Sequence, residues 1–187
     1  MKILTIAEMG EMIIRSGKVR VSDPCYEKDI DTHCAGTIKS VKNGKWDCIV
    51  IRSDEGDWGM RNAILLAHHV DHPVEYEDSG WDKQEFEVGV DSGQAGIYDL
   101  PEYHGGDEEG GEYGDPDSWY DKNCRLTLDT DSQAGILADK TGVVSSTGFG
   151  DGGYECFTIR DTYNPKFETI AIKIDFGVID VEDEDDD

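Results

Sequence analysis

Residues 168–176, which read ETIAIKIDF, alternate large apolar side chains with small or polar ones at a period of two. Such alternation puts one set of side chains on each face of a β-strand, whereas an α-helix requires a period of 3.6. Shorter alternating runs recur along the chain, and 22 glycines supply residues suited to tight turns. The pattern predicts an all-β fold, mainly antiparallel and built as a sandwich or barrel, with few short helices.

Four other segments show the same strand pattern, at residues 85–90, 125–128, 142–145 and 154–159. Residues 62–70 are ambiguous. Ile64, Leu65 and His68 would line one face of a helix, but a short apolar run is equally compatible with a buried strand.

Two dipeptides predict hairpins. Asn43-Gly44 suits the two central positions of a type I′ turn, and we expect it to join strands at residues 37–42 and 45–52. Ser16-Gly17 is expected to join residues 12–14 to residues 18–21 in the same way.

Residues 1–179 are expected to form a single β-rich domain. Within it, residues 99–121 are rich in glycine and acid and predict a long, mobile acidic surface loop. Residues 180–187, DVEDEDDD, predict a disordered acidic tail.

The charge is uneven along the chain. The formal net charge is −25, yet residues 1–61 carry ten basic and ten acidic side chains, while residues 62–187 carry seven basic and 32 acidic ones. So negative a chain repels phosphate, which argues against direct nucleic-acid binding and against docking to anionic membranes. The expected partner is a basic protein.

The expected cellular compartment is inferred from targeting signals and membrane spans. We find no secretory h-region and no run of 18 apolar residues, so we expect a cytoplasmic protein without a membrane span. Five cysteines without a C-x-x-C pair are expected to be reduced thiols, most of them in the core.

Three motifs stand out: VSDPCY at residues 21–26, VGVDSGQAGIYD at residues 88–99 and GVVSSTGFGDGGY at residues 142–154. They resemble the D-P-C-Y, V-D-S-G-x-A-G and G-F-G-D-G-x-Y motifs of an uncharacterised family of small bacterial and phage proteins. The resemblance extends over residues 18–176. It implies a phage or mobile-element setting and a β-rich fold in which the motifs converge, and it carries no catalytic residues.

A ligand pocket where these motifs meet is one functional hypothesis, either for a small-ligand or metal-sequestering module or for an unrecognised hydrolase. Its residues would be Asp23, Cys25, Tyr26, Asp91, Ser92, Gln94, Asp151 and Tyr154. Ordinary turn chemistry explains the glycine-rich motif at least as well. No Walker loop, nucleophile elbow or papain-type cysteine signature is present, so an enzymatic role stays undecided, with a non-enzymatic one favoured.

No resident cofactor is predicted. Residues 129–140 begin like an EF-hand loop, but Ala134 and Lys140 stand where the loop needs Gly and a bidentate Glu. Weak calcium binding by Asp107, Glu108, Glu109 and Glu112 stays open, and the sequence does not identify a metal.

The leading hypothesis follows from the localised charge. An acidic surface can imitate the phosphate rows of a nucleic acid and occupy the groove of a basic nucleic-acid-handling protein, such as a CRISPR nuclease, and so inhibit it. The residues expected to replace phosphates are Glu102, Asp107, Glu108, Glu109, Glu112, Asp115 and Asp117. The alternative is a solvated face that only aids solubility.

Overall fold

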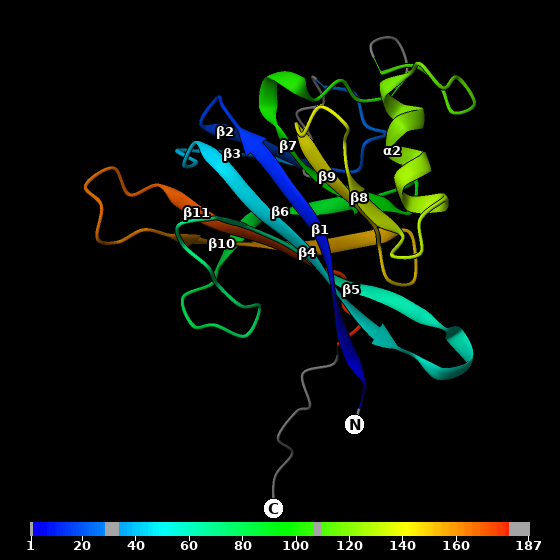
Figure 1. The fold of residues 1–187 in the computed structure, drawn as a ribbon, viewed down its shortest axis with the longest axis horizontal. Coiled ribbons are helices and arrows are strands. Elements are labelled where there is room, and N and C mark those ends of the chain that lie inside the picture. The colour runs from blue at the N-terminus through cyan, green and yellow to red at the C-terminus, as the bar shows by residue number, and fades with distance from the viewer. Residues whose placement is uncertain (1, 29–33, 107–109, 180–187) are drawn as a thin grey trace, which may run out of the picture.

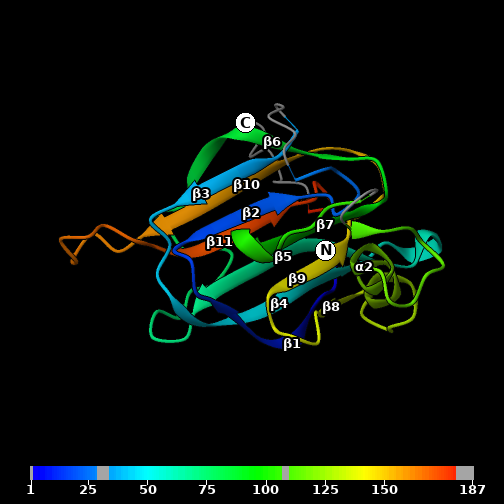
Figure 2. The ribbon, with the colours of Figure 1, turned by 90° about the horizontal axis from the view of Figure 1, so that it is seen from above.

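The computed structural model describes residues 2–28, 34–106 and 110–179, which form two stacked antiparallel sheets (Figures 1 and 2). The six-stranded sheet has the order β1 (Leu4–Ile14), β4 (Gly44–Asp54), β5 (Met60–His69), β11 (Thr169–Asp175), β10 (Gly152–Arg160) and β6 (Asp82–Val90). The five-stranded sheet has the order β3 (Gly36–Lys39), β2 (Lys18–Ser22), β7 (Gln94–Asp99), β9 (Gly142–Ser146) and β8 (Ala134–Ile136). Among the described residues, the helical elements are α2 (Trp119–Leu128) and two short 3₁₀ turns, η1 (Gly56–Trp58) and η2 (Leu100–Glu102). The all-β sandwich expected from the sequence is confirmed.

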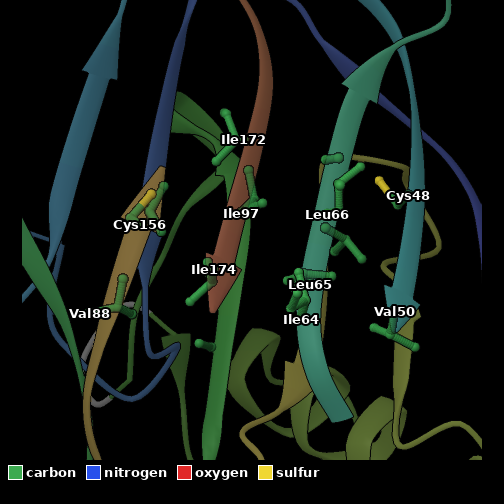
Figure 3. Close-up of a cluster of buried hydrophobic side chains, with 14 of the residues drawn as sticks. Cys48, Val50, Ile64, Leu65, Leu66, Val88, Ile97, Cys156, Ile172 and Ile174 are labelled. Atoms are coloured by element: carbon green, nitrogen blue, oxygen red, sulfur yellow. The ribbon is translucent and has the colours of Figure 1, made fainter. Parts of the chain in front are cut away.

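The main core lies between the sheets, where the inward faces of both contribute aliphatic side chains (Figure 3). Ile172 and Ile174 on β11 belong to the alternating set that predicted this strand, and both are fully buried. They join Leu65 of β5 and Ile97 of β7 in one cluster. Each such side chain adds roughly 1.5–3 kcal/mol to stability relative to an exposed position.

The centre of the five-stranded sheet is buried on both faces. Ile97 and Val143 belong to the main core, but their chain neighbours Tyr98 and Val144 belong to a second cluster with Trp119 and other side chains of the α2 region. Successive side chains on a strand point to opposite faces. Helix α2 therefore covers the outer face of this sheet, beside β8 and β9 (Figure 1).

Strand β5 is also buried on both faces, which explains why residues 62–70 lack an alternating pattern. Leu66 points away from Leu65, yet both are fully buried. The connection between β5 and β6 supplies apolar side chains that pack against the core cluster, and the Lys173 ammonium of the neighbouring strand donates to the Tyr76 carbonyl at 2.8 Å. Of the two structures that the sequence left open, the strand is the one adopted.

Both predicted hairpins are wrong, because each turn carries the chain from one sheet to the other. Strands β1 and β4 belong to the six-stranded sheet, whereas β2 and β3 belong to the five-stranded one. The two crossings lie side by side: the Asn43 side chain accepts from the Gly17 amide at 2.7 Å, and the Val41 amide donates to the Gly17 carbonyl. Asn43 therefore fastens one crossing to the other instead of forming a type I′ turn.

The strand expected at residues 125–128 is also wrong, since these residues form the end of α2. Ser118 caps the helix, its hydroxyl accepting from the Asp121 amide at 3.0 Å. Buried side chains then recur at helical spacing, at Cys124 and Thr127. The cap satisfies an amide that a helix start leaves without a partner, and it fixes the helix at this point.

The acidic segment at residues 99–121 is not a loose surface loop in its described part. Tyr103 is fully buried, and the glycines at 105 and 106 lie against the backbone of residues 25–28. The predicted tail, residues 180–187, lies outside the described residues.

Tyr98 shows how tightly the second cluster is built. Its ring lies across Gly96 of its own strand and Gly142 of the next, and its hydroxyl donates to Asn123 of α2 at 2.8 Å. Gly96→Ala would force a methyl group into this buried ring, so we expect a loss of about 1–3 kcal/mol of unfolding free energy. Gly153→Ala is the matched control, because there a methyl group would meet only the end of the Glu87 side chain. Urea denaturation measures both, and equal midpoints would contradict the packing described.

Candidate functional site

The first two motifs meet at the carboxylate of Asp23, which is fully buried. Its Oδ1 accepts from the Cys25 amide at 2.8 Å and from the Ser92 hydroxyl at 2.6 Å. Its Oδ2 accepts from the amides of Asp91 and Ser92 at 2.9 and 2.7 Å. One buried anion thus holds the turn at residues 23–26 against the turn that joins β6 to β7.

The third motif joins the same assembly. The Asp151 carboxylate accepts from the Gly93 amide at 2.9 Å, and the Thr147 amide donates to the Gly93 carbonyl at 3.1 Å. Tyr154 closes its own turn by donating to the Gly150 carbonyl. The three motifs therefore lie together in space.

Other polar side chains of the three motifs, which we call the motif cluster, also form hydrogen bonds. Tyr26 donates its hydroxyl to the Asp91 carboxylate at 2.6 Å. The Gln94 amide group donates to Ser92 at 3.2 Å and accepts from Thr127 of α2 at 3.1 Å. All eight residues of the predicted pocket thus have internal hydrogen bonds, as expected of a structural tie between turns.

Cys25 is a poor nucleophile in this setting. Burial is the main cause that raises the pKa of its thiol, and the nearby Asp23 carboxylate raises it further. A catalytic cysteine needs a positive environment that lowers its pKa and favours the thiolate. The geometry gives no support to a hydrolase that uses Cys25, and the ligand-pocket hypothesis stays a prediction.

We expect Asp23→Asn to destabilise the fold strongly. An amide nitrogen cannot accept a hydrogen bond, so the donors that now converge on one carboxylate oxygen lose their acceptor, at about 1–3 kcal/mol for each buried donor. Asp129→Asn is the control, since Asp129 is largely exposed. Chemical denaturation monitored by fluorescence gives both values. A loss for Asp23→Asn no larger than that for the control would contradict the role assigned to Asp23.

The raised pKa of Cys25 predicts slow alkylation. Alkylation requires the thiolate and access to the sulfur, so we expect iodoacetamide to modify the exposed Cys34 about tenfold or more faster than the half-buried Cys25. The rate at Cys25 should still be rising above pH 9, because its thiolate forms only at higher pH. Peptide mass spectrometry over time resolves the two sites, and modification of Cys25 first would contradict this prediction.

A second candidate site lies where the acidic segment enters α2. Ser118 donates its hydroxyl to the Glu112 carbonyl at 2.7 Å, and the Ser118 amide donates to the Asp115 carbonyl at 2.9 Å. The buried Asp121 carboxylate accepts from the Gly114 amide at 2.8 Å. These bonds fold residues 112–118 into a run of turns fixed to the start of the helix. The carboxylates of Glu112, Asp115 and Asp117 are exposed on it.

Tyr103 anchors the other end of the acidic segment and links the two candidate sites. Its hydroxyl donates to the Tyr26 carbonyl at 2.6 Å and lies 2.9 Å from the Asp23 carbonyl, which can share the same proton, so it binds the backbone of the first motif. Its ring packs edge-on against Trp119 with centroids 5.1 Å apart. Glu102, the preceding residue, is exposed.

An acidic cavity of about 500 Å³ opens beside this segment. Asp115 and Asp117 line one part of it and Asp139, from the connection between β8 and β9, lines another. The rings of Trp119 and His104, 5.8 Å apart, contribute aromatic surface. Two of the seven acidic residues predicted from the sequence thus share a cavity with a carboxylate that the prediction missed. Asp107, Glu108 and Glu109 lie outside the described residues.

An apolar cavity of about 540 Å³ lies next along the helix. Its apolar lining comes from Pro116, Leu126 and Ile136, and it shares Lys122, Leu137 and Ala138 with the acidic cavity. Figure 1 shows α2 beside β8, and residues of α2, of β8 and of the β8–β9 connection line this cavity. No sequence pattern pointed to it, because its walls come from a helix and a strand connection whose pairing only the fold defines.

A patch of exposed aromatic side chains lies at the far end of the β4–β5 hairpin. Trp58 is 70% exposed and Phe149, in the third motif, is 58% exposed, and the two rings meet edge to face at 6.4 Å. The Arg61 guanidinium lies 5.6 Å from the Phe149 ring. The sequence-based site residues did not include this patch, although Phe149 lies in the third motif.

Within residues 2–28, 34–106 and 110–179, no three His, Cys, Asp or Glu side chains are gathered so as to hold a metal ion. Three of the four residues named for weak calcium binding are outside these ranges, so that expectation stays a prediction. In the same part of the chain, no helix is both long and apolar enough to cross a membrane.

No family model matches the chain, and neither does any curated protein or solved structure. The family resemblance drawn from the three motifs stays a prediction.

Proposed function

We propose that the protein is an acidic interaction protein of phage or mobile-element type, which binds a basic partner protein. In the sharpest form of this proposal it mimics nucleic acid and inhibits a nucleic-acid-handling protein, such as a CRISPR-type nuclease. The observation that carries the proposal is the anchoring of the acidic segment: Glu112, Asp115 and Asp117 are exposed on turns that hydrogen bonds fix to α2.

Anchoring matters because binding otherwise costs the entropy of ordering the groups that make contact. Asp115 already accepts from the Asp117 amide at 3.0 Å, and Tyr103 fixes the preceding chain. Carboxylates held in this way can act as a fixed row of negative charges, which is the property of a phosphate backbone that a basic groove recognises.

The large negative charge supports the same proposal at longer range. A formal charge of −25 attracts cationic surfaces and speeds their encounter, an effect that salt screens. The competing function, a ligand pocket at the motif cluster, has less support, since the polar atoms there are bonded to one another.

The triple variant Glu112→Gln, Asp115→Asn and Asp117→Asn tests the proposal. We expect its affinity for a nonaarginine peptide to fall about tenfold at low salt, since each exposed ion pair is worth roughly 0.2–1 kcal/mol. The matched control changes three exposed carboxylates elsewhere, Glu75→Gln, Glu77→Gln and Glu85→Gln, and so removes the same net charge.

Calorimetric titration of both variants at about 0.05 M and about 0.3 M salt separates local from global electrostatics. The unchanged protein should lose affinity steeply with salt, and the triple variant should lose less. Equal affinities of the two variants would show that only net charge acts and would overturn the role of the acidic segment.

A further inference from the structure

The acidic cavity and the apolar cavity adjoin each other along α2, and we call the pair the α2 groove. Lys122, Leu137 and Ala138 line both cavities. The α2 residues that line the two cavities extend from Ser118 and Trp119 to Arg125 and Leu126, a length of about two helical turns. A rise of 1.5 Å per residue makes this roughly 9–12 Å.

The two ends of the α2 groove differ in chemistry. At the acidic end, three carboxylates face a single ammonium, that of Lys122, together with the rings of Trp119 and His104. Carboxylates combined with aromatic faces favour a cationic group. At the other end the surface comes mainly from Pro116, Leu126, Ile136 and Leu137.

Two cationic side chains line the apolar end, Lys122 and Arg125, and Arg125 is already neutralised within the protein. The Arg125 guanidinium lies 3.3 Å from the Asp121 carboxylate and 3.6 Å from that of Asp129. It also stacks over the Tyr113 ring at 5.2 Å. Arg125 therefore does not make this end selective for anions, and the net preference of the whole groove is for positive charge.

The length of the α2 groove determines how far apart two side chains of a bound peptide must be to reach both of its ends. An extended chain advances about 3.3 Å per residue, and alternate side chains point the same way. Side chains at positions i and i+2 are thus about 6.6 Å apart at the backbone, and a long basic side chain reaches several ångströms further. Such a pair fits the 9–12 Å between the two ends.

We propose that the α2 groove binds an extended segment of a partner protein in which a Lys or Arg side chain and a large apolar side chain stand two residues apart. This inference rests on the proposed function and specifies the partner. Charge decides between occupants: a second copy of this chain would bring another 25 negative charges, whereas a basic segment is attracted.

The test uses four fluorescent peptides with identical Gly-Ser flanks, whose central residues are Arg-Ser-Leu, Arg-Ser-Ser, Ser-Ser-Leu and Asp-Ser-Leu. Fluorescence polarisation with the full chain at about 0.15 M salt should show that Arg-Ser-Leu binds about tenfold more tightly than Arg-Ser-Ser, which lacks the apolar side chain. It should bind about fivefold more tightly than Ser-Ser-Leu, which lacks one ion pair, and Asp-Ser-Leu should bind most weakly. Equal binding of Arg-Ser-Leu and Arg-Ser-Ser would overturn the role assigned to the apolar end. Tighter binding of Asp-Ser-Leu than of Arg-Ser-Leu would overturn the preference for positive charge.

Substitutions in the lining of the α2 groove test whether the peptide binds there. Leu126→Ala should abolish the preference for Leu over Ser, whereas Leu128→Ala, on the same helix but outside the lining, should not. Ala138→Lys is a second variant that leaves the core untouched, because Ala138 is exposed and lines both cavities. It should weaken Arg-Ser-Leu binding about tenfold, and unchanged binding by Ala138→Lys would overturn the inference.

The outcomes separate this inference from the proposed function. If the nonaarginine peptide requires Glu112, Asp115 and Asp117 but Arg-Ser-Leu shows no preference, the function stands and the groove does not bind this segment. If neither nonaarginine binding nor Arg-Ser-Leu binding depends on Glu112, Asp115 and Asp117, both the proposed function and this inference fail. Self-association in sedimentation velocity that Leu126→Ala removes would instead assign the groove to a second copy of the chain.

Discussion

The carboxylate of Asp23 is the interaction on which the candidate surfaces depend. It is buried and accepts four hydrogen bonds, from Cys25, Asp91 and Ser92, and so joins two turns that lie far apart in sequence. Hydrogen bonds to a charged acceptor are roughly twice as strong as neutral ones. The carboxylate lies at the ends of β2 and β6, where a strand of the five-stranded sheet ends beside a strand of the six-stranded sheet.

The same backbone supports the acidic segment. Tyr103 binds the carbonyl groups of Asp23 and Tyr26, and its ring packs against Trp119 at the first turn of α2. A chain of contacts thus runs from the buried carboxylate to the mouth of the acidic cavity. The sequence presented the three motifs and the acidic segment as alternative sites. In the structure the first motif holds Tyr103, and Tyr103 in turn positions the acidic segment.

The fold class was predictable from local pattern, because period-two alternation depends on one buried face, and residues 168–176 have such a pattern. Strand β5 did not show it, since a strand covered on both faces has no polar side to alternate with. The hairpins failed for another reason. A type I′ preference at Asn43-Gly44 is a local property, but the sheet that the next strand joins depends on long-range packing, and the Asn43 side chain was used to bind Gly17.

The candidate site was predictable in its charges and not in its shape. Asp115 and Asp117 followed from counting acidic residues, but Asp139 and Leu126 lie in segments with no unusual composition. One available signal was the serine at 118, three residues before Asp121, which resembles a helix start. Recognising it would have replaced the strand expected at residues 125–128 with α2, and would have placed Leu126 on a helix next to the acidic segment.

Shape matters here because charge alone discriminates poorly. At physiological salt the Debye length is about 8 Å, and an exposed ion pair contributes at most about 1 kcal/mol, so a row of carboxylates accepts many basic surfaces nearly equally. Burying an apolar side chain beside the ion pair adds a term that salt does not screen and that depends on fit. In the α2 groove both terms come from the same pair of elements, α2 and the β8–β9 connection: the capped start of α2 and Asp139 present carboxylates, and Leu126, two turns further on, and Ile136 present the apolar wall. A partner that offered only one of the two groups would lose the contribution of the other, and selectivity then arises from the fixed distance between them rather than from the number of negative charges.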